Sequence, residues 1–185
     1  MFRIHRIVIS LGSLLVLSLA CRLTPTKVRT FENEMITFTI PAGWQTMDEI
    51  WDRPAYLEND YKGLGVQEIV TIQYPPNQGK GKVFFAVAAA PMATGQDLES
   101  RFTQAYQMAV PEIEDESKSL FEQGELAGYE ITYRRPWGEP WWQFRDIWLE
   151  KDSVIYVLSF YASPNSFETY SDTFDQMLES FQFKD

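Results

Sequence analysis

The sequence predicts an α+β protein with about six antiparallel strands, a helix in the middle of the chain and a second helix at its end. Six segments show either the alternating apolar pattern of a half-buried strand or a continuous apolar run of strand length. Two other segments place their apolar residues at helical spacing. The last three strand segments are joined by short links, which favours an antiparallel meander.

The first twenty residues have the pattern of a secretion signal. Arg3 and Arg6 precede an uncharged run of 14 residues, which is too short for a comfortable membrane span. The stretch Leu17-Ser18-Leu19-Ala20-Cys21 then resembles a bacterial lipobox, although leucine is usual where Ser18 stands. That resemblance implies that Cys21 becomes the lipid-modified first residue of the mature protein. The alternative is a plain secretory leader with an incidental cysteine, but Cys21 is the only cysteine and stands at the expected place.

These boundaries give a signal peptide over residues 1–20, a lipidated cysteine and tether over residues 21–30, and one domain over residues 31–185. The chain has 16 basic and 26 acidic residues, and the leader removes two arginines and no acid, so the mature net charge is −12. Such a surface repels nucleic acid and anionic headgroups. We therefore expect the membrane contact to come from the lipid, on the extracytoplasmic side of a bacterial membrane.

The residue inventory argues against several enzyme classes. The single histidine, His5, lies in the leader, so the mature chain lacks an imidazole base and a histidine metal ligand. Acylation of Cys21 would use the only thiol, and no glycine-rich phosphate loop is present. We interpret the acidic run over residues 112–117 as a solvated loop rather than a calcium site, because it lacks calcium-loop spacing. The protein is thus expected to be no enzyme and to need no cofactor or metal.

The elements of the N-terminal half follow from alternation and turn residues. Strands are predicted over residues 36–40, 65–74 and 83–91, the last covered on both faces because it is wholly apolar. Residues 47–60 contain Pro54 and are expected to be irregular with one short helical turn. A helix is predicted over residues 94–110, with Thr94 and Asp97 at capping-box spacing.

The C-terminal half is predicted to hold a three-stranded meander and a helix. The strands cover residues 127–135, 141–150 and 153–162, with Lys151 and Asp152 as a tight link. Ser163 is the expected N-cap of the last helix and Pro164 its first residue. An aromatic and aliphatic stripe on this helix should lie across the sheet: Phe167, Tyr170, Phe174, Leu178 and Phe181.

In "FENEMITFTIPAGW" a strand runs into a proline-x-glycine-tryptophan turn, and the chain ends in a meander, a helix and a closing "SFQF". These two stretches resemble the opening and the C-terminal module of the PsbP family, the extrinsic photosystem II subunits and their lipoprotein relatives. The resemblance implies an α/β/α sandwich with a central antiparallel sheet of about six strands. It also implies a role as an accessory or assembly subunit, on the periplasmic side of a cell membrane or the lumenal side of a thylakoid. No acidic cluster matches a family cation site.

The stretch "RRPWGEPWWQFRDIW" holds four of the six tryptophans. Prolines and glycine over residues 136–140 predict a turn with Trp137 at its tip. Alternation then places Trp142, Phe144, Asp146 and Trp148 on the core face of a strand, and Trp141, Gln143, Arg145 and Ile147 on a more polar face. Trp137 and Trp141 either cover the sheet edge against Arg134, Arg135 or Arg145, or form a partner site with Glu139 and Arg145.

The sequence therefore predicts a non-enzymatic, lipid-anchored extracytoplasmic protein that serves as scaffold or accessory subunit of a membrane complex, in one version photosystem II. The first alternative is an envelope glycan- or peptide-binding module that uses exposed tryptophan. The second is a glycan hydrolase that uses carboxylates such as Glu139 and Asp146, since a pair of acids suffices for that chemistry.

Overall fold

The computed structural model describes residues 27–47, 65–75, 83–108, 113–136 and 141–184. The signal peptide, Cys21, most of the segment over residues 47–60, and both Trp137 and Glu139 lie outside these ranges. None of the helices in these ranges is long and apolar enough to cross a membrane.

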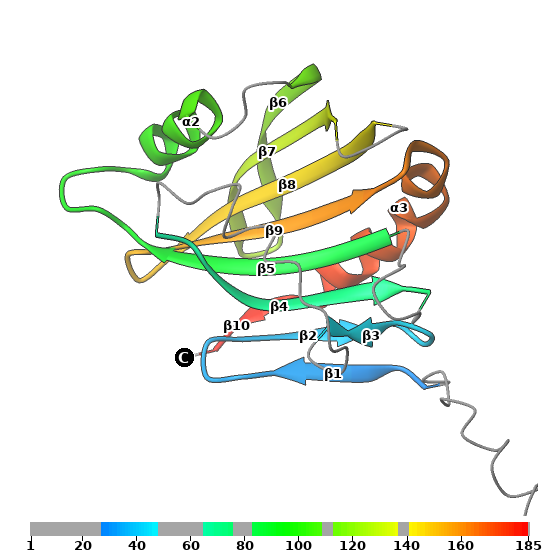
Figure 1. The fold of residues 1–185 in the computed structure, drawn as a ribbon. Coiled ribbons are helices and arrows are strands. Elements are labelled where there is room, and N and C mark those ends of the chain that lie inside the picture. The colour runs from blue at the N-terminus through cyan, green and yellow to red at the C-terminus, as the bar shows by residue number, and fades with distance from the viewer. Residues whose placement is uncertain (1–26, 48–64, 76–82, 109–112, 137–140, 185) are drawn as a thin grey trace, which may run out of the picture.

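A seven-stranded antiparallel sheet forms the centre of the molecule (Figure 1). Its order is β3-β4-β5-β9-β8-β7-β6, so the meander and the apolar strand β5 supply the middle of the sheet. The strands cover β3 (Gln45–Thr46), β4 (Gln67–Tyr74), β5 (Val83–Pro91), β6 (Glu114–Gln123), β7 (Leu126–Arg135), β8 (Trp142–Lys151) and β9 (Val154–Ala162).

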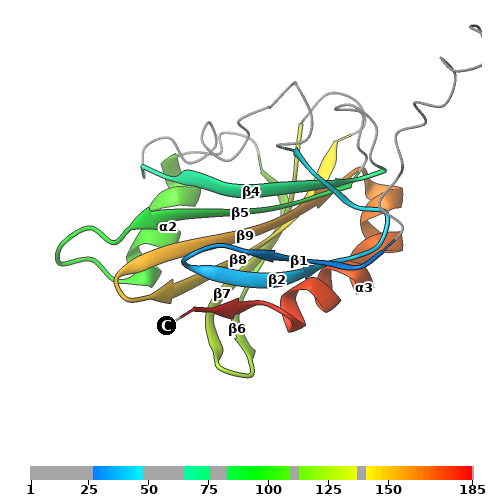
Figure 2. The same ribbon diagram turned by 90° about the horizontal axis from the view of Figure 1, so that it is seen from below.

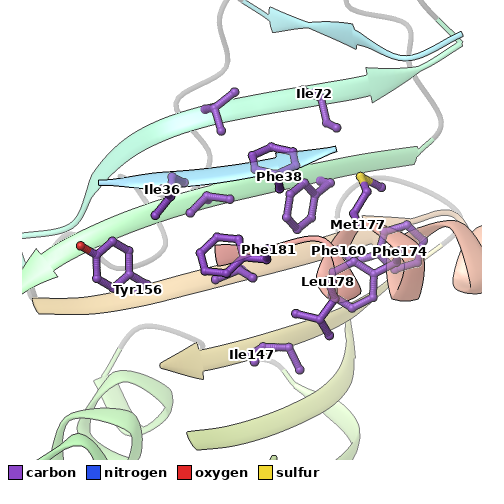
Figure 3. Packing of buried hydrophobic residues seen from close by; sticks show 14 of the residues in the cluster. Ile36, Phe38, Ile72, Ile147, Tyr156, Phe160, Phe174, Met177, Leu178 and Phe181 are labelled. Atoms are coloured by element: carbon purple, nitrogen blue, oxygen red, sulfur yellow. The ribbon is translucent and has the colours of Figure 1, made fainter. Parts of the chain in front are cut away.

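Helix α3 (Pro164–Glu179) and a small three-stranded sheet cover one face (Figure 2). The small sheet has the order β1-β2-β10 and consists of β1 (Arg29–Glu32), β2 (Ile36–Ile40) and β10 (Gln182–Phe183). Apolar residues of both layers form a continuous core between them (Figure 3). Phe174 of α3 is fully buried and stacks on Phe160 of β9, with 5.1 Å between ring centroids.

Helix α2 (Leu98–Met108) covers the opposite face of the large sheet and gives a second apolar cluster. Phe102 lies edge-on to Trp148 of β8 at 5.7 Å between ring centroids. With a helix on each face of an antiparallel sheet, the predicted α/β/α sandwich is confirmed. The second helical layer explains why β5 and β9 are apolar on both faces.

The tight turn between β8 and β9 has a local cause. Asp152 and Ser153 both have positive φ angles, 53° and 60°, as a two-residue type I′ hairpin requires. Aspartate tolerates this conformation better than most residues, because its short polar side chain can bond nearby backbone. Ser163 is the N-cap of α3 and Pro164 its first residue, as predicted.

Three local predictions were wrong. Residues 114–117 belong to strand β6 and not to a loop, because their backbone pairs with β7 although their side chains are exposed. The acidic start of β6 contains a bulge between Glu114 and Ser117, with Asp115 at a φ of 53°. Helix α2 begins at Leu98, since Asp97 Oδ1 accepts the Ser100 N–H at 2.7 Å and so caps the helix there.

The third wrong prediction concerns the start of the folded domain. Arg29 and Thr30 were assigned to the tether, but they pair with Ile40 and Thr39 as the first half of β1. The short strands β3 and β10 were also absent from the prediction, because two residues carry no detectable alternation.

Candidate functional site

From Trp141 on, the tryptophan-rich stretch is described and leads into β8, which lies between β9 and β7 in the large sheet. Trp141 and Trp142 are half-buried, whereas Trp148 is fully buried. The predicted alternation is correct, because Trp142, Phe144 and Trp148 all pack in the cluster under α2. Ile147 lies on the other face but is also fully buried, since α3 and the small sheet cover that face.

Asp146 is the centre of a buried polar network on the α2 side of the sheet. Its Oδ2 accepts hydrogen bonds from Tyr106 Oη at 2.7 Å and from Tyr133 Oη at 2.9 Å, and its Oδ1 accepts one from Ser159 Oγ. Trp148 Nε1 donates to Tyr106 Oη at 3.0 Å. These donors come from one helix and three strands, so the carboxylate connects α2 to the sheet.

The geometry of Asp146 suits structure better than hydrolysis. The residue has 0% of its surface exposed, so a polysaccharide cannot reach it in this conformation. Its oxygens already accept three hydroxyl hydrogen bonds, which is how a buried carboxylate is normally satisfied. Within the described ranges, no group of three or more metal-ligating side chains lies close enough to hold an ion.

Arg145 lies on the opposite face and joins three elements. Its Nε donates to Glu130 Oε1 of β7 at 2.7 Å, and its Nη1 donates to Asp175 Oδ1 of α3 at 2.6 Å. The guanidinium also lies 4.8 Å from the centre of the Phe174 ring. The side chain is 19% exposed. A partner that binds Arg145, as predicted, would therefore have to contact a guanidinium that also makes these internal contacts.

Four rings form a stacked row across the α2 face, near the end of the sheet where β8 begins. Phe84, Tyr161, Phe144 and Tyr133 come from β5, β9, β8 and β7, and each is in register with the next. Successive centroids are 5.1, 5.4 and 5.1 Å apart, with interplanar angles of 11°, 15° and 7°. Trp142 packs beside Phe84 at 5.8 Å, so this ring extends the row and is not a free binding surface.

A groove of about 550 Å³ lies at the other end of the sheet, and sequence reasoning missed it. Its walls are the β6–β7 hairpin, the end of β8, the C-terminal turn of α3 and strand β10. The ring of Phe183, in its floor, packs against Phe181 and Tyr156, with 5.3 and 4.8 Å between ring centroids. Burial raises the pKa of Tyr156, and the Asp152 carboxylate raises it further. No linear pattern indicates the groove, because three segments that are far apart in the sequence build it.

Comparisons by sequence give no relative: no protein-family model matches the chain, and no curated protein matches it significantly. Comparison of structures does give matches. The cyanobacterial PsbP (CyanoP) of Synechocystis sp. PCC 6803 aligns with 86% of this chain and 94% of its own, at 14% identity and a TM-score of 0.52.

Two further structures share the architecture. LpqN, a protein involved in cell envelope biogenesis of Mycobacterium tuberculosis, aligns with 86% of this chain and 91% of its own, at 10% identity and a TM-score of 0.52. The Ran-binding protein Mog1p of Saccharomyces cerevisiae aligns with 85% of this chain and 95% of its own, at 10% identity and a TM-score of 0.50. At such low sequence identity, these structural matches establish a shared fold and not a shared activity. The chain therefore has the PsbP-like fold that its opening strand and its C-terminal module predicted.

Proposed function

We propose that this protein is a non-enzymatic lipoprotein, held by a lipid on Cys21 to the extracytoplasmic face of a membrane, where it serves as an accessory or assembly subunit of a membrane complex. The observation that carries the proposal is the leader, in which Arg3 and Arg6 precede an uncharged apolar run that ends in Leu17-Ser18-Leu19-Ala20-Cys21. The fold supports it, because PsbP and the envelope-biogenesis protein LpqN have the same architecture.

The distance between Cys21 and the domain fits anchoring close to the bilayer. Strand β1 begins at Arg29, so seven residues separate it from the cysteine. Seven residues span at most roughly 25 Å when fully extended. An anchored domain would therefore stay next to the membrane surface, where a membrane complex presents its extracytoplasmic parts. The photosystem II version of the proposal applies only if the host carries out oxygenic photosynthesis.

Two observations favour a binding role over catalysis. Asp146, the acid named for a hydrolase, is fully buried and bonded to three hydroxyl groups. The mature chain also has no histidine. Hydrolysis of a panel of envelope glycans by the purified chain, with loss of activity in Glu139→Gln, would contradict this part of the proposal.

Membrane fractionation with and without globomycin tests the anchor. Wild-type protein should sediment with membranes, and Cys21→Ala should appear in the soluble extracytoplasmic fraction or as unprocessed precursor. Globomycin should cause the precursor of the wild type to accumulate. A Cys21→Ala protein that is processed and membrane-bound like the wild type would show that the cysteine is not the anchor.

Partner capture tests the accessory role. Detergent-solubilised membranes from cells with a tagged wild-type chain should yield a membrane protein that a tagged, unrelated lipoprotein does not retain. The double variant Trp137→Ala and Trp141→Ala separates the two interpretations of the tryptophan-rich turn. If these rings bind the partner, capture fails and the melting temperature hardly changes, whereas a drop of many degrees with intact capture assigns them to packing.

A further inference from the structure

We infer that the groove between the β6–β7 hairpin and the C-terminal end of α3 binds an extended, basic segment of a protein partner. The inference deepens the proposed function and rests on it for the existence of that partner, but the groove can be tested without the anchor. It follows from the groove's shape, its charge and the open edge of a strand.

Apolar side chains from the end of α3 and from β10 form the floor of the groove. Leu178 and Phe181 are buried at its base, while Phe183 is half-buried and presents part of its ring to the groove. A volume of about 550 Å³ is enough for a few side chains of a bound segment. Apolar side chains of a partner would therefore find contact area on the ring of Phe183.

Three glutamates from three different elements surround this floor. Glu125 lies in the β6–β7 hairpin, Glu150 near the end of β8, and Glu179 in the last turn of α3. All three are exposed, and none forms an ion pair with the lysines and arginines in the described part of the chain. Lys151 also lines the groove, but its Nζ lies 3.9 Å from Asp152 Oδ2 and forms an ion pair with that carboxylate instead.

The end of helix α3 adds to the negative potential. The helix ends at Glu179, and its last turn contains no basic residue. Carbonyl groups at the C-terminus of a helix carry a partial negative charge that lysine or arginine usually compensates. Here a glutamate stands in that place, so a cation supplied by a partner would be stabilised by both the dipole and the carboxylates.

Strand β10 offers backbone groups to an extended segment. It is an outer strand of the small sheet, next to β2, and lies on the side of the β6–β7 hairpin (Figure 2). Lys184 N–H donates to Met35 at 2.9 Å, and Gln182 pairs with Thr37. Because hydrogen bonding alternates along an antiparallel strand, the N–H and C=O of Phe183 point away from β2. A partner in extended conformation can pair with these two groups.

These features select one chemistry. An extended segment alternates its side chains, so lysines or arginines at every second position would face the glutamates while the intervening apolar side chains contact Phe183. The same three carboxylates repel an anionic lipid headgroup or an acidic peptide. The groove is therefore suited to a basic strand of a protein and not to the membrane surface.

Fluorescence anisotropy with a labelled Val-Lys-Val-Lys-Val-Lys peptide tests the inference on the full chain in detergent micelles. The peptide should bind at low salt, and a Val-Glu-Val-Glu-Val-Glu peptide should not. The triple variant Glu125→Gln, Glu150→Gln, Glu179→Gln should bind the basic peptide about tenfold more weakly, the size expected for three solvent-exposed charge pairs. The matched control Glu99→Gln, Glu168→Gln, Asp172→Asn removes the same charge from exposed helix positions and should change binding by less than about twofold.

Equal weakening in both triple variants would mean that the acidic chain attracts basic peptides without a site, and would overturn the inference. An unchanged affinity in the groove variant would overturn it as well.

Carbodiimide coupling gives an independent measurement, because it joins peptide lysines only to carboxylates within reach. Cross-links should map to Glu125, Glu150 or Glu179, and cross-links mainly elsewhere contradict the groove. Acylation of Cys21 does not affect either result, so failure of the groove and failure of the anchor are distinguishable.

Discussion

Tyr106 Oη donates a hydrogen bond of 2.7 Å to Asp146 Oδ2, and this bond joins helix α2 to the centre of the large sheet across 40 residues of sequence. Trp148 Nε1 donates to the same hydroxyl at 3.0 Å, so the tyrosine both donates and accepts. Tyr133 and Ser159 hold the carboxylate from the neighbouring strands. One buried acid thus ties helix α2 to three neighbouring strands of the sheet.

Replacement of Asp146 by alanine should therefore destabilise the fold. The change leaves three buried hydroxyl groups without their acceptor, and we expect it to lower the free energy of unfolding by about 3 kcal/mol or more. Urea denaturation followed by circular dichroism measures this, with Asp172→Asn on the exposed side of α3 as control. A loss no greater than in the control would show that the network contributes nothing to stability.

Arg145 should also contribute to stability, whatever its role towards a partner. It bonds Glu130 and Asp175 at 2.7 and 2.6 Å and lies over the Phe174 ring. Arg145→Ala should cost about 1–2 kcal/mol in the same experiment, because the ion pairs are partly shielded from water. Arg134→Ala, which removes an exposed pair with Asp115, should cost less than about 1 kcal/mol. Equal costs would remove the distinction between the two arginines.

Gly128 should tolerate no side chain. A Cβ at this position of β7 would overlap the backbone carbonyl oxygen of Trp148 on the paired strand β8, and backbone cannot move aside without breaking the ladder. Gly128→Ala should thus lower the melting temperature by many degrees. Ala127→Ser, at the neighbouring exposed position, should leave it within a few degrees. A stable Gly128→Ala protein would mean that the two strands are further apart than described.

The cap of α2 should make part of the stability depend on pH. Hydrogen bonds from the Ser100 side chain and backbone lower the pKa of Asp97 below its usual value. A lowered pKa in the folded state means that the contribution is present above the pKa of the unfolded chain and is lost as the pH falls through the folded value. Asn is an equally good N-cap that does not titrate.

Asp97→Asn should accordingly match the wild type near neutral pH and lose less stability between about pH 5 and pH 3. Urea midpoints measured across this range provide the comparison. Glu32, whose pKa is lowered by Lys184, titrates in the same direction and remains in both proteins, so it does not affect the difference. Parallel pH profiles for the two proteins would rule out the cap as a source of the dependence.

Regular elements of the fold could be predicted because each has its own pattern. Strand β5 matches the predicted residues 83–91, and α3 begins at Pro164 after the predicted cap Ser163. Strand β6 was missed because its first seven residues, Glu114–Leu120, are all exposed, which removes the apolar alternation by which strands are detected. Its place in the sheet comes from backbone pairing with β7, and a sequence does not display that pairing.

The faces of β8 show the same limit. Alternation correctly placed Trp148 and Phe144 under α2. It could not show that Arg145 lies against Phe174 and Asp175, since this depends on where α3 crosses the sheet. The groove is a stronger example, because Glu125, Glu150 and Glu179 come from separate elements and resemble ordinary surface acids in the sequence.

The central claim is that Cys21 becomes the lipidated first residue of a membrane-anchored mature protein. Intact mass spectrometry of the chain purified from membranes, followed by fragmentation of its N-terminal peptide, tests it most directly. The account predicts that the peptide begins at Cys21 and carries a thioether-linked diacylglyceryl group, and that Arg22 is the second residue. A mature chain that begins at another residue, or one with an unmodified Cys21 thiol, would contradict the account.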